Sequence, residues 1–273
     1  MEKFQFNRFL NVLKWYLQVN RNPLLAWTVG VFLCVFVGEC FMLWAMAKTD
    51  HQAWSLQYSN YVSGITGFWL GATLILVLYI QTTLFSKISN KRIGTIFLTL
   101  PASNAEKFTV LFIYVLLISP LCLLSAFVLG DMLRMVVIPL FSQVGMVSCL
   151  REVVSGIFIF PPQDTLPTIL TECLFLFSAV VWLHSMYLLA GAALRKNAFS
   201  FVSTALLLAV CLLGYLISSN IDKLRTWDNI SQFFKVFIWL CILGGLLWAA
   251  CNYRLSYRIF KNYQLINNKT TNL

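Results

Sequence analysis

The chain has 273 residues, of which 59% are hydrophobic and only 11% are charged. A soluble domain carries roughly 25% charged residues, so this composition excludes an ordinary soluble protein and indicates a membrane protein. The net charge of +10 does not predict nucleic-acid binding, because the basic residues fall in short loops where anionic lipid headgroups and the cytoplasmic preference of Lys and Arg account for them.

The N-terminal segment, residues 4–19, has the pattern of an amphipathic helix. Polar side chains recur at helical spacing on one face, and aromatic and aliphatic side chains cover most of the rest. Such a helix lies in the interface of a membrane. We expect Arg21-Asn22-Pro23 to break it, since proline disfavours a continuing helix. Residues 1–23 would then form an interfacial helix in front of the first span.

Six apolar runs follow, each close to the roughly 20 residues that a membrane crossing needs. They are residues 24–47, 61–84, 108–130, 170–194, 198–218 and 234–253. Backbone groups in lipid must find their hydrogen bonds within the segment, so the spans are expected to be helices. The predicted fold is therefore all-α: one polytopic transmembrane domain over residues 1–273, with six spans in 24–253 and a cytoplasmic tail in 254–273.

The region from Asp131 to Pro167 has two interpretations. It is either an external segment between spans three and four or it contains an extra span, because apolar patches alternate with prolines and charges. With six spans and the N-terminus inside, 14 basic residues are cytoplasmic and six are external, Arg134 among the latter. An extra span would weaken this bias, so the positive-inside rule favours six spans with both termini cytoplasmic.

Motifs for chemistry are missing from the sequence. It contains no GxxxxGK[ST] phosphate-binding loop and no HExxH zinc motif, and its two histidines and eight unevenly spaced cysteines predict no metal site or disulfide framework. We therefore expect no catalytic, cofactor-binding or metal-binding residues and no enzymatic activity. A secondary transporter is also disfavoured, since internal repeats are not evident.

Two ionisable residues in the apolar runs are candidates for a translocation path, Glu39 in span one and His184 in span four. A carboxylate deep in a membrane costs roughly 2.5–3.5 kcal/mol on insertion scales. Glu39 therefore either faces a polar cavity or pairs with a polar group of a neighbouring helix, and His184 either lines the path or is a satisfied buried histidine. Glycines in span two, Gly64, Gly67 and Gly71, predict close helix packing within the chain or at a dimer seam.

A short polar stretch between two long apolar runs extends from Phe85 to Phe108. Its charged first half and the apolar residues Ile96, Phe97 and Leu98 predict a short amphipathic helix that ends at Pro101. Ser103 and Glu106 have the spacing of a capping box, with Ser103 at the N-cap and Glu106 three positions into the third span.

This stretch resembles the loop between the second and third spans of ABC-2 type exporter permeases. The matching residues are Lys91-Arg92-x-Gly94-Thr95, then Leu98-x-Leu100-Pro101-x-Ser103-x-x-Glu106. The six-span plan with an interfacial N-terminal helix also fits that family. Two features depart from it: Asn90-Lys91-Arg92-Ile93 stands where the family often has an acid, and only a short connection, Ser219 to Phe233, joins spans five and six.

The resemblance implies the membrane subunit of a bacterial exporter in the cytoplasmic (inner) membrane. A separate ABC ATPase subunit would use ATP, and two permease chains would pair as a homodimer or heterodimer. The N-terminal helix would be the elbow helix. The implied ATPase-coupling residues are Lys91, Arg92, Gly94, Thr95, Leu100, Pro101, Ser103, Glu106 and Lys107. The alternative function is a non-transporting membrane anchor in a multi-protein complex.

Overall fold

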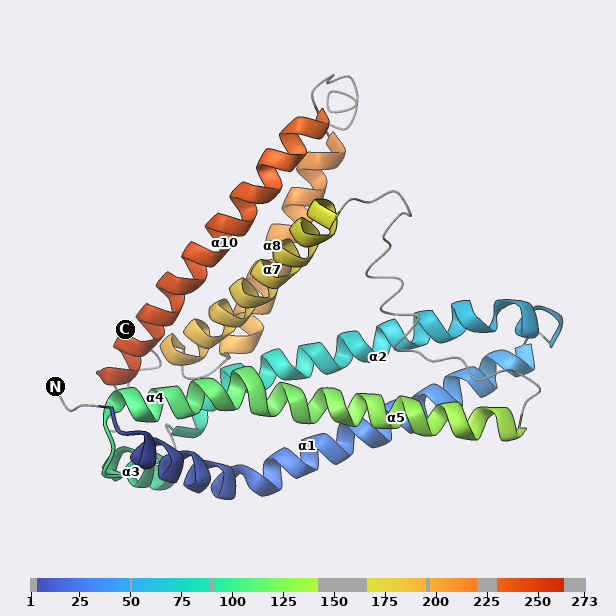
Figure 1. The fold of residues 1–273 in the computed structure, drawn as a ribbon. Helices are drawn as coiled ribbons and strands as arrows, with labels where there is room; N and C mark the ends of the chain where they lie inside the picture. Colours follow the sequence, from blue (N-terminus) through green and yellow to red (C-terminus); the bar gives the residue numbers. More distant parts are fainter. Residues whose placement is uncertain are drawn as a thin grey trace. The chain divides into compact units, whose positions relative to one another are not determined.

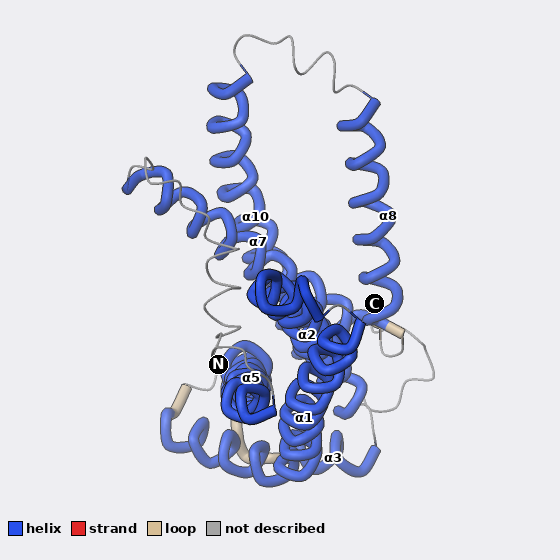
Figure 2. The backbone as a smooth tube through the Cα atoms, turned by 90° about the vertical axis from the view of Figure 1, so that its right-hand side faces the viewer, coloured by secondary structure: helices blue, strands red, loops and turns tan. Residues whose placement is uncertain are grey.

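The computed structural model describes residues 4–49, 51–88, 91–141, 166–194, 197–219 and 230–262, and every regular element in these ranges is a helix (Figures 1 and 2). The first half of the chain contains α1 (Phe6–Thr49), α2 (His51–Ile88), α3 (Lys91–Thr99), α4 (Asn104–Ile113), the π-helical turn η1 (Tyr114–Ile118) and α5 (Ser119–Phe141). The second half contains α7 (Leu166–Ala193), α8 (Ala198–Ser219) and α10 (Ile230–Lys261).

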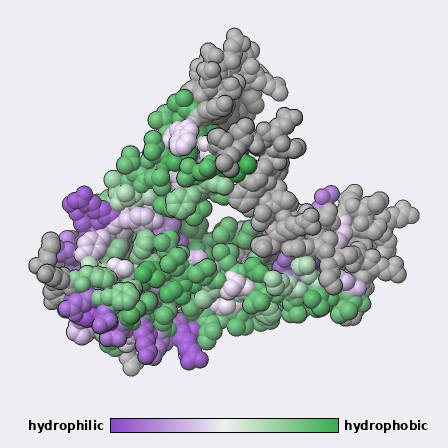
Figure 3. Space-filling view, in the orientation of Figure 1, coloured by the Kyte–Doolittle hydropathy of each residue, from purple (hydrophilic) through white to green (hydrophobic). Residues whose placement is uncertain are grey.

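In the described part of the chain, six helical stretches are long and apolar enough to cross a membrane. They are Phe6–Ala45, Asn60–Leu84, Asn104–Leu140, Ile169–Ala193, Ala198–Leu216 and Val236–Lys261. Large apolar side chains are exposed along all of them, and apolar residues cover much of the long helices in Figure 3, whereas hydrophilic ones gather near the start of α1. Within the described residues the six predicted spans and the all-α class are confirmed, and this is the architecture of a multi-pass membrane protein.

The break predicted at Arg21-Asn22-Pro23 is wrong. α1 continues through Pro23 as one helix of 44 residues, although it changes direction along its length (Figure 1). Pro23 has no N–H to offer the carbonyl four residues earlier, which bends a helix but need not end it when packing holds both halves. Three residues before the proline, the buried Asn20 side chain donates to the Tyr16 carbonyl at 3.0 Å.

The third span is longer than predicted. α4, η1 and α5 follow one another without interruption from Asn104 to Phe141, so the helix includes Asp131, Arg134 and Pro139. The predicted end of this helix at residue 130 is therefore wrong. The charge of Arg134 is tolerated in a helix because acidic partners surround it, as described below. The remainder of the uncertain region, residues 142–165, lies outside the described residues. The prediction of an external segment or an extra span in it is therefore not tested.

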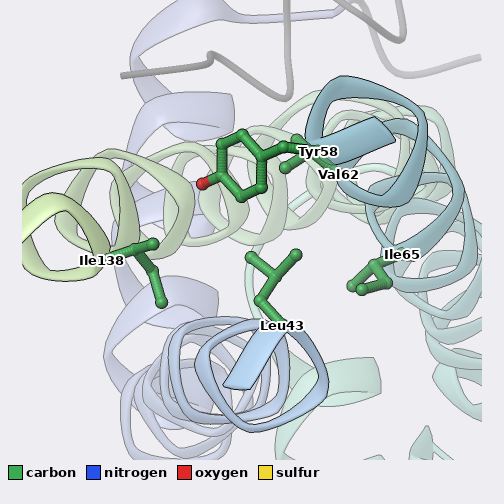
Figure 4. Packing of buried hydrophobic residues seen from close by; sticks show 5 residues of the cluster. All are labelled: Leu43, Tyr58, Val62, Ile65 and Ile138. Carbon is green, nitrogen blue, oxygen red and sulfur yellow. The ribbon is translucent and has the colours of Figure 1, made fainter. Parts of the chain in front are cut away.

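The chain divides into two compact units, residues 1–77 with 105–161 and residues 78–104 with 162–273. In the first unit α1 packs along α5. Figure 4 shows side chains of α1, α2 and α5 converging in one apolar cluster, made of Leu43, Tyr58, Val62, Ile65 and Ile138. Gly38 of α1 permits a close approach here, because a methyl group at this position would overlap the Trp69 ring of α2.

In the second unit α7 packs along α10 and also contacts α8. Gly191 of α7 lies so close to the end of α2 that a methyl group would meet the Thr82 Cα and carbonyl oxygen at 3.0 Å. The prediction of close packing within the chain at Gly64, Gly67 and Gly71 is wrong for the described residues, since nothing lies within 4 Å of a methyl group built at any of them. Close approach occurs instead at other glycines, among them Gly191 of α7 and Gly245 of α10, which stand beside small residues in Gly191-Ala192-Ala193 and Gly244-Gly245.

Candidate functional site

The polar stretch between the second and third spans contains the short helix α3. Its nine residues, Lys91–Thr99, include the basic pair and the Gly94-Thr95 step of the motif. Gly94 and Phe97 are buried, while Thr95, Ile96 and Thr99 are exposed, so α3 has an inner and an outer face. Phe97 packs near Phe260 of α10, with ring centroids 6.5 Å apart. The side chains of Lys91 and Arg92 lie outside the described residues.

A tight turn follows α3. The Ala102 N–H donates to the Leu100 carbonyl at 2.7 Å, which closes a three-residue turn around Pro101. The fixed φ of proline suits the central position of such an inverse γ-turn. The helix therefore ends before Pro101 as predicted, and the chain is redirected into α4 within a few residues. Pro101 is exposed, and Leu100 and Ser103 are half-buried.

The acid of the motif, Glu106, lies in the first turn of α4 and is completely buried. Its Oε1 accepts a hydrogen bond from the Gln5 backbone N–H at 2.6 Å and one from the Arg8 guanidinium at 3.1 Å. A carboxylate is favoured at a helix N-terminus, and charge-assisted hydrogen bonds are the stronger kind. Glu106 thus fastens the start of α1 to the start of α4, and we call this arrangement the Glu106 junction.

The positions predicted for the two residues of the capping box are confirmed. α4 begins at Asn104, which places Ser103 at the N-cap and Glu106 at N3, as the pattern predicts. The contact of Glu106 with α1 was not foreseen, because the sequence gives no sign that residues about 100 positions apart meet. Lys107, also in the first turn of α4, is buried as well.

Glu39, the first candidate path residue, belongs to a buried charged cluster in the first unit. Its Oε2 lies 3.1 Å from Nε of Arg134, which also contacts Asp131 through Nη2 at 2.6 Å. The Arg134 Nη1 donates to the hydroxyl of Tyr58 at 3.2 Å. Glu39 and Arg134 are fully buried and Asp131 almost so. Of the two interpretations of Glu39, pairing with a neighbouring helix is the one the structure supports.

Asp131, Arg134 and Tyr58 were not among the predicted site residues. A signal did exist, since Asp131 and Arg134 are three residues apart, a spacing that places both on one face of a helix. These two residues are missing from the predicted site because the third helix was expected to end before them. The run free of charges ends at Gly130, so both residues were assigned to the segment outside the membrane.

His184, the second candidate path residue, lies in a neutral polar seam between α7 and α10. Its Nδ1 is 2.8 Å from the hydroxyl of Tyr253, and the Asn252 amide donates to Ser185 at 3.0 Å. One turn and a half earlier in α7, Ser178 donates to the Ile242 carbonyl at 3.0 Å. The interpretation of His184 as a hydrogen-bonded buried histidine is the one these contacts favour.

Metal ligands do not gather in the described ranges, where no three His, Cys, Asp or Glu side chains are placed to hold an ion. The described cysteines are all unpaired thiols.

Comparison with known proteins finds no matching family model, no matching curated protein and no matching solved structure. The family resemblance is therefore carried by the residues of the loop and by the helical plan.

Proposed function

We propose that the chain is the permease subunit of an ABC-2 type exporter, in which a separate ATPase subunit hydrolyses ATP and drives export. In this proposal α3 is the coupling helix, the N-terminal part of α1 is the elbow helix, and both termini are cytoplasmic. The six membrane-length helices and the polar stretch between the second and third of them agree with this arrangement.

The observation that carries the proposal is the Glu106 junction. Glu106, the acid of the motif, is not exposed to solvent. It is buried and hydrogen-bonded to the start of the N-terminal helical segment. Force applied to α3 would reach α4 through the short Leu100–Ser103 turn, and the junction would pass it to α1. A coupling loop needs such a connection, whereas an ordinary connecting loop does not.

The outer face of α3 supplies a surface for the ATPase. Ile96 is 47% exposed although it lies in a polar connection between two apolar helices, and Thr95 and Thr99 flank it. An apolar side chain within a polar rim is the pattern of a protein interface.

For the dimer, the exposed glycine face of α2 at Gly64 and Gly67, beside the exposed Phe68, allows a second chain to approach closely.

Binding to the ATPase can be tested with Ile96→Ala. The ATPase encoded beside this chain would be co-purified with it, and the affinity measured in detergent. We expect a loss of about fivefold to tenfold or more, because truncating an interface anchor costs about 1 kcal/mol or more. Ile75→Ala is the matched control, since Ile75 of α2 is similarly exposed, at 57%, but lies in a span. Equal affinities of both variants would refute α3 as the docking surface.

Coupling is tested with Glu106→Gln in proteoliposomes that contain the complex. The amide cannot pair with Arg8 as a carboxylate does, so transport per ATP hydrolysed should fall while ATPase binding persists. Glu172→Gln, at an exposed glutamate of α7, is the control. Transport that is unchanged in Glu106→Gln would contradict the coupling role. ATPase binding without movement of any substrate by the unaltered protein would favour the membrane-anchor alternative.

A further inference from the structure

The charged cluster of the first unit does not balance. It contains two carboxyl groups, Glu39 and Asp131, and one guanidinium, Arg134, and the side chains are 0%, 4% and 0% exposed. If both acids were ionised, one negative charge would remain uncompensated among apolar helices. Such a charge costs several kcal/mol in a protein interior, and neutralisation by a proton is the usual outcome.

The contacts separate the two acids. Oδ1 of Asp131 accepts two guanidinium hydrogen bonds, from Nε at 3.1 Å and from Nη2 at 2.6 Å. Glu39 has only the ionic contact of its Oε2 with the same Nε, and among the described residues neither of its oxygens has a hydrogen-bond partner. Charge-assisted hydrogen bonds favour the ionised form of an acid. Arg134 therefore supports the charge of Asp131 better than that of Glu39.

Among the described residues, the other groups around Glu39 cannot cancel its charge. Tyr58 of α2 places its hydroxyl against Arg134, and Cys40, the neighbour of Glu39 in α1, is a neutral thiol. α5 contributes Asp131 and Arg134, which are already counted. Two acids that share one counter-charge at short range cannot both ionise easily, because each ionised form repels the other.

We propose that the Glu39–Asp131–Arg134 cluster is a proton-binding site, with one proton on the Glu39 carboxyl group at neutral pH. The ligand is the proton alone. The inference is independent of the exporter proposal, since it rests only on the packing of α1, α2 and α5. Exchange of the proton with water requires this packing to open, so the site links pH to the contact of α1 with α5.

The sign of the linkage follows from the proton count. The folded protein would hold one proton that an opened, hydrated cluster releases at neutral pH. Whichever state binds more protons loses stability as pH rises, so the packed state should lose stability from mildly acidic pH upward, where an opened glutamate ionises at about pH 4.3, until Glu39 is ionised in the packed state as well. Glu39→Gln removes the proton and keeps the neutral shape, and that part of the pH dependence should vanish with it.

Infrared spectroscopy of the full-length protein in lipid tests the site. We expect a carbonyl stretching band of a protonated carboxylic acid at neutral pH, which Glu39→Gln abolishes and the exposed control Glu172→Gln leaves unchanged. Asp131→Asn should also abolish the band, because Glu39 then becomes the only counter-charge of Arg134 and must ionise.

Thermal unfolding of the same variants assigns the proton to one acid. Glu39→Gln should unfold near the temperature of the unaltered protein at neutral pH, and Asp131→Asn should unfold at a lower temperature. The reverse order would place the proton on Asp131 and overturn the assignment. A spectrum without the band, or a band that persists in Glu39→Gln, would overturn the site itself. Stabilisation by sodium in a protein without the band would identify a metal cation as the ligand instead.

Discussion

Two polar regions within the apolar helices differ in kind. The cluster of the first unit is charged and centred on Arg134, which contacts Glu39, Asp131 and Tyr58. The seam of the second unit is neutral and consists of paired hydrogen bonds between α7 and α10, among them those of His184 with Tyr253 and of Ser185 with Asn252. Both join helices that are far apart in the sequence.

The difference lies in what happens when one partner is lost. A neutral hydrogen bond between membrane helices contributes about 0.6 kcal/mol on average, because the separated helices also find partners. A buried ion pair adds little net stability relative to an apolar pair, but removing one partner strands a charge and costs about 3–5 kcal/mol. Loss of one hydrogen bond in the seam should therefore lower the stability only slightly, whereas loss of a charged partner in the cluster should lower it strongly.

This comparison predicts its largest effect for Arg134→Met. Methionine has no charge, so Asp131 and Glu39 lose the cation that pairs with them among the described residues. We expect the free energy of unfolding in detergent to fall by about 3–5 kcal/mol near neutral pH. The loss should shrink at low pH, where protonation of Asp131 removes the stranded charge.

The control is Arg254→Met, the same change at an exposed position of α10. A loss in Arg134→Met that is no larger than in this control would mean that the cluster is hydrated and that its charges are screened.

An intermediate effect is expected at the seam from Gly245→Ala. A methyl group at Gly245 would lie 2.8 Å from the Ser178 hydroxyl, which donates to the Ile242 carbonyl from this position. Displacing Ser178 separates α7 from α10, and overpacking of this kind costs about 1–3 kcal/mol. Thermal unfolding in detergent measures it.

The neighbouring Gly244 offers a matched control for this substitution, since nothing lies within 4 Å of a methyl group there. Gly244→Ala should be neutral or slightly stabilising, because alanine has the better helix propensity. If the two substitutions had the same effect, the close contact of α7 with α10 at Gly245 would be refuted.

The sequence predicts the spans well and their ends poorly. Apolar runs of membrane length leave few alternatives to a helix, so the number and approximate positions of the six helices follow from hydropathy alone. Pro23 and Asp131 gave wrong ends. A proline can be accommodated when packing holds both halves of the helix, and a charge can continue a span when a partner on another helix compensates it.

The polar partners depend on contacts that local patterns do not contain. The spacing of Ser103 and Glu106 predicts where α4 begins, but Glu106 accepts hydrogen bonds from Gln5, just before α1, and from Arg8 of α1. Likewise, Glu39 was identified as costly in lipid before its partner Arg134 was known. Residue type reveals that a partner is needed, whereas only tertiary packing reveals which residue provides it.

The smallest effect should come from Tyr253→Phe, which removes one hydroxyl from the neutral seam. This hydroxyl lies 2.8 Å from His184 Nδ1 and donates to the Val181 carbonyl at 3.3 Å. The Val181 carbonyl retains its place in the backbone ladder of α7, and the ring of Tyr253 still packs against His184. We therefore expect a loss of about 0.6 kcal/mol in the free energy of unfolding in detergent.

Tyr215→Phe, at a tyrosine of α8 that is 70% exposed, is the control and should change nothing. The diagnostic quantity is the ratio of the Tyr253→Phe loss to that of Arg134→Met. A ratio near one would mean that His184 is charged or that the seam is as demanding as the cluster, and the distinction between the two regions would fail. A small ratio would mean that substitutions destabilise the charged cluster much more than the neutral seam. The reason is that loss of a partner in the cluster leaves an unpaired charge, whereas in the seam it leaves only an unmade hydrogen bond.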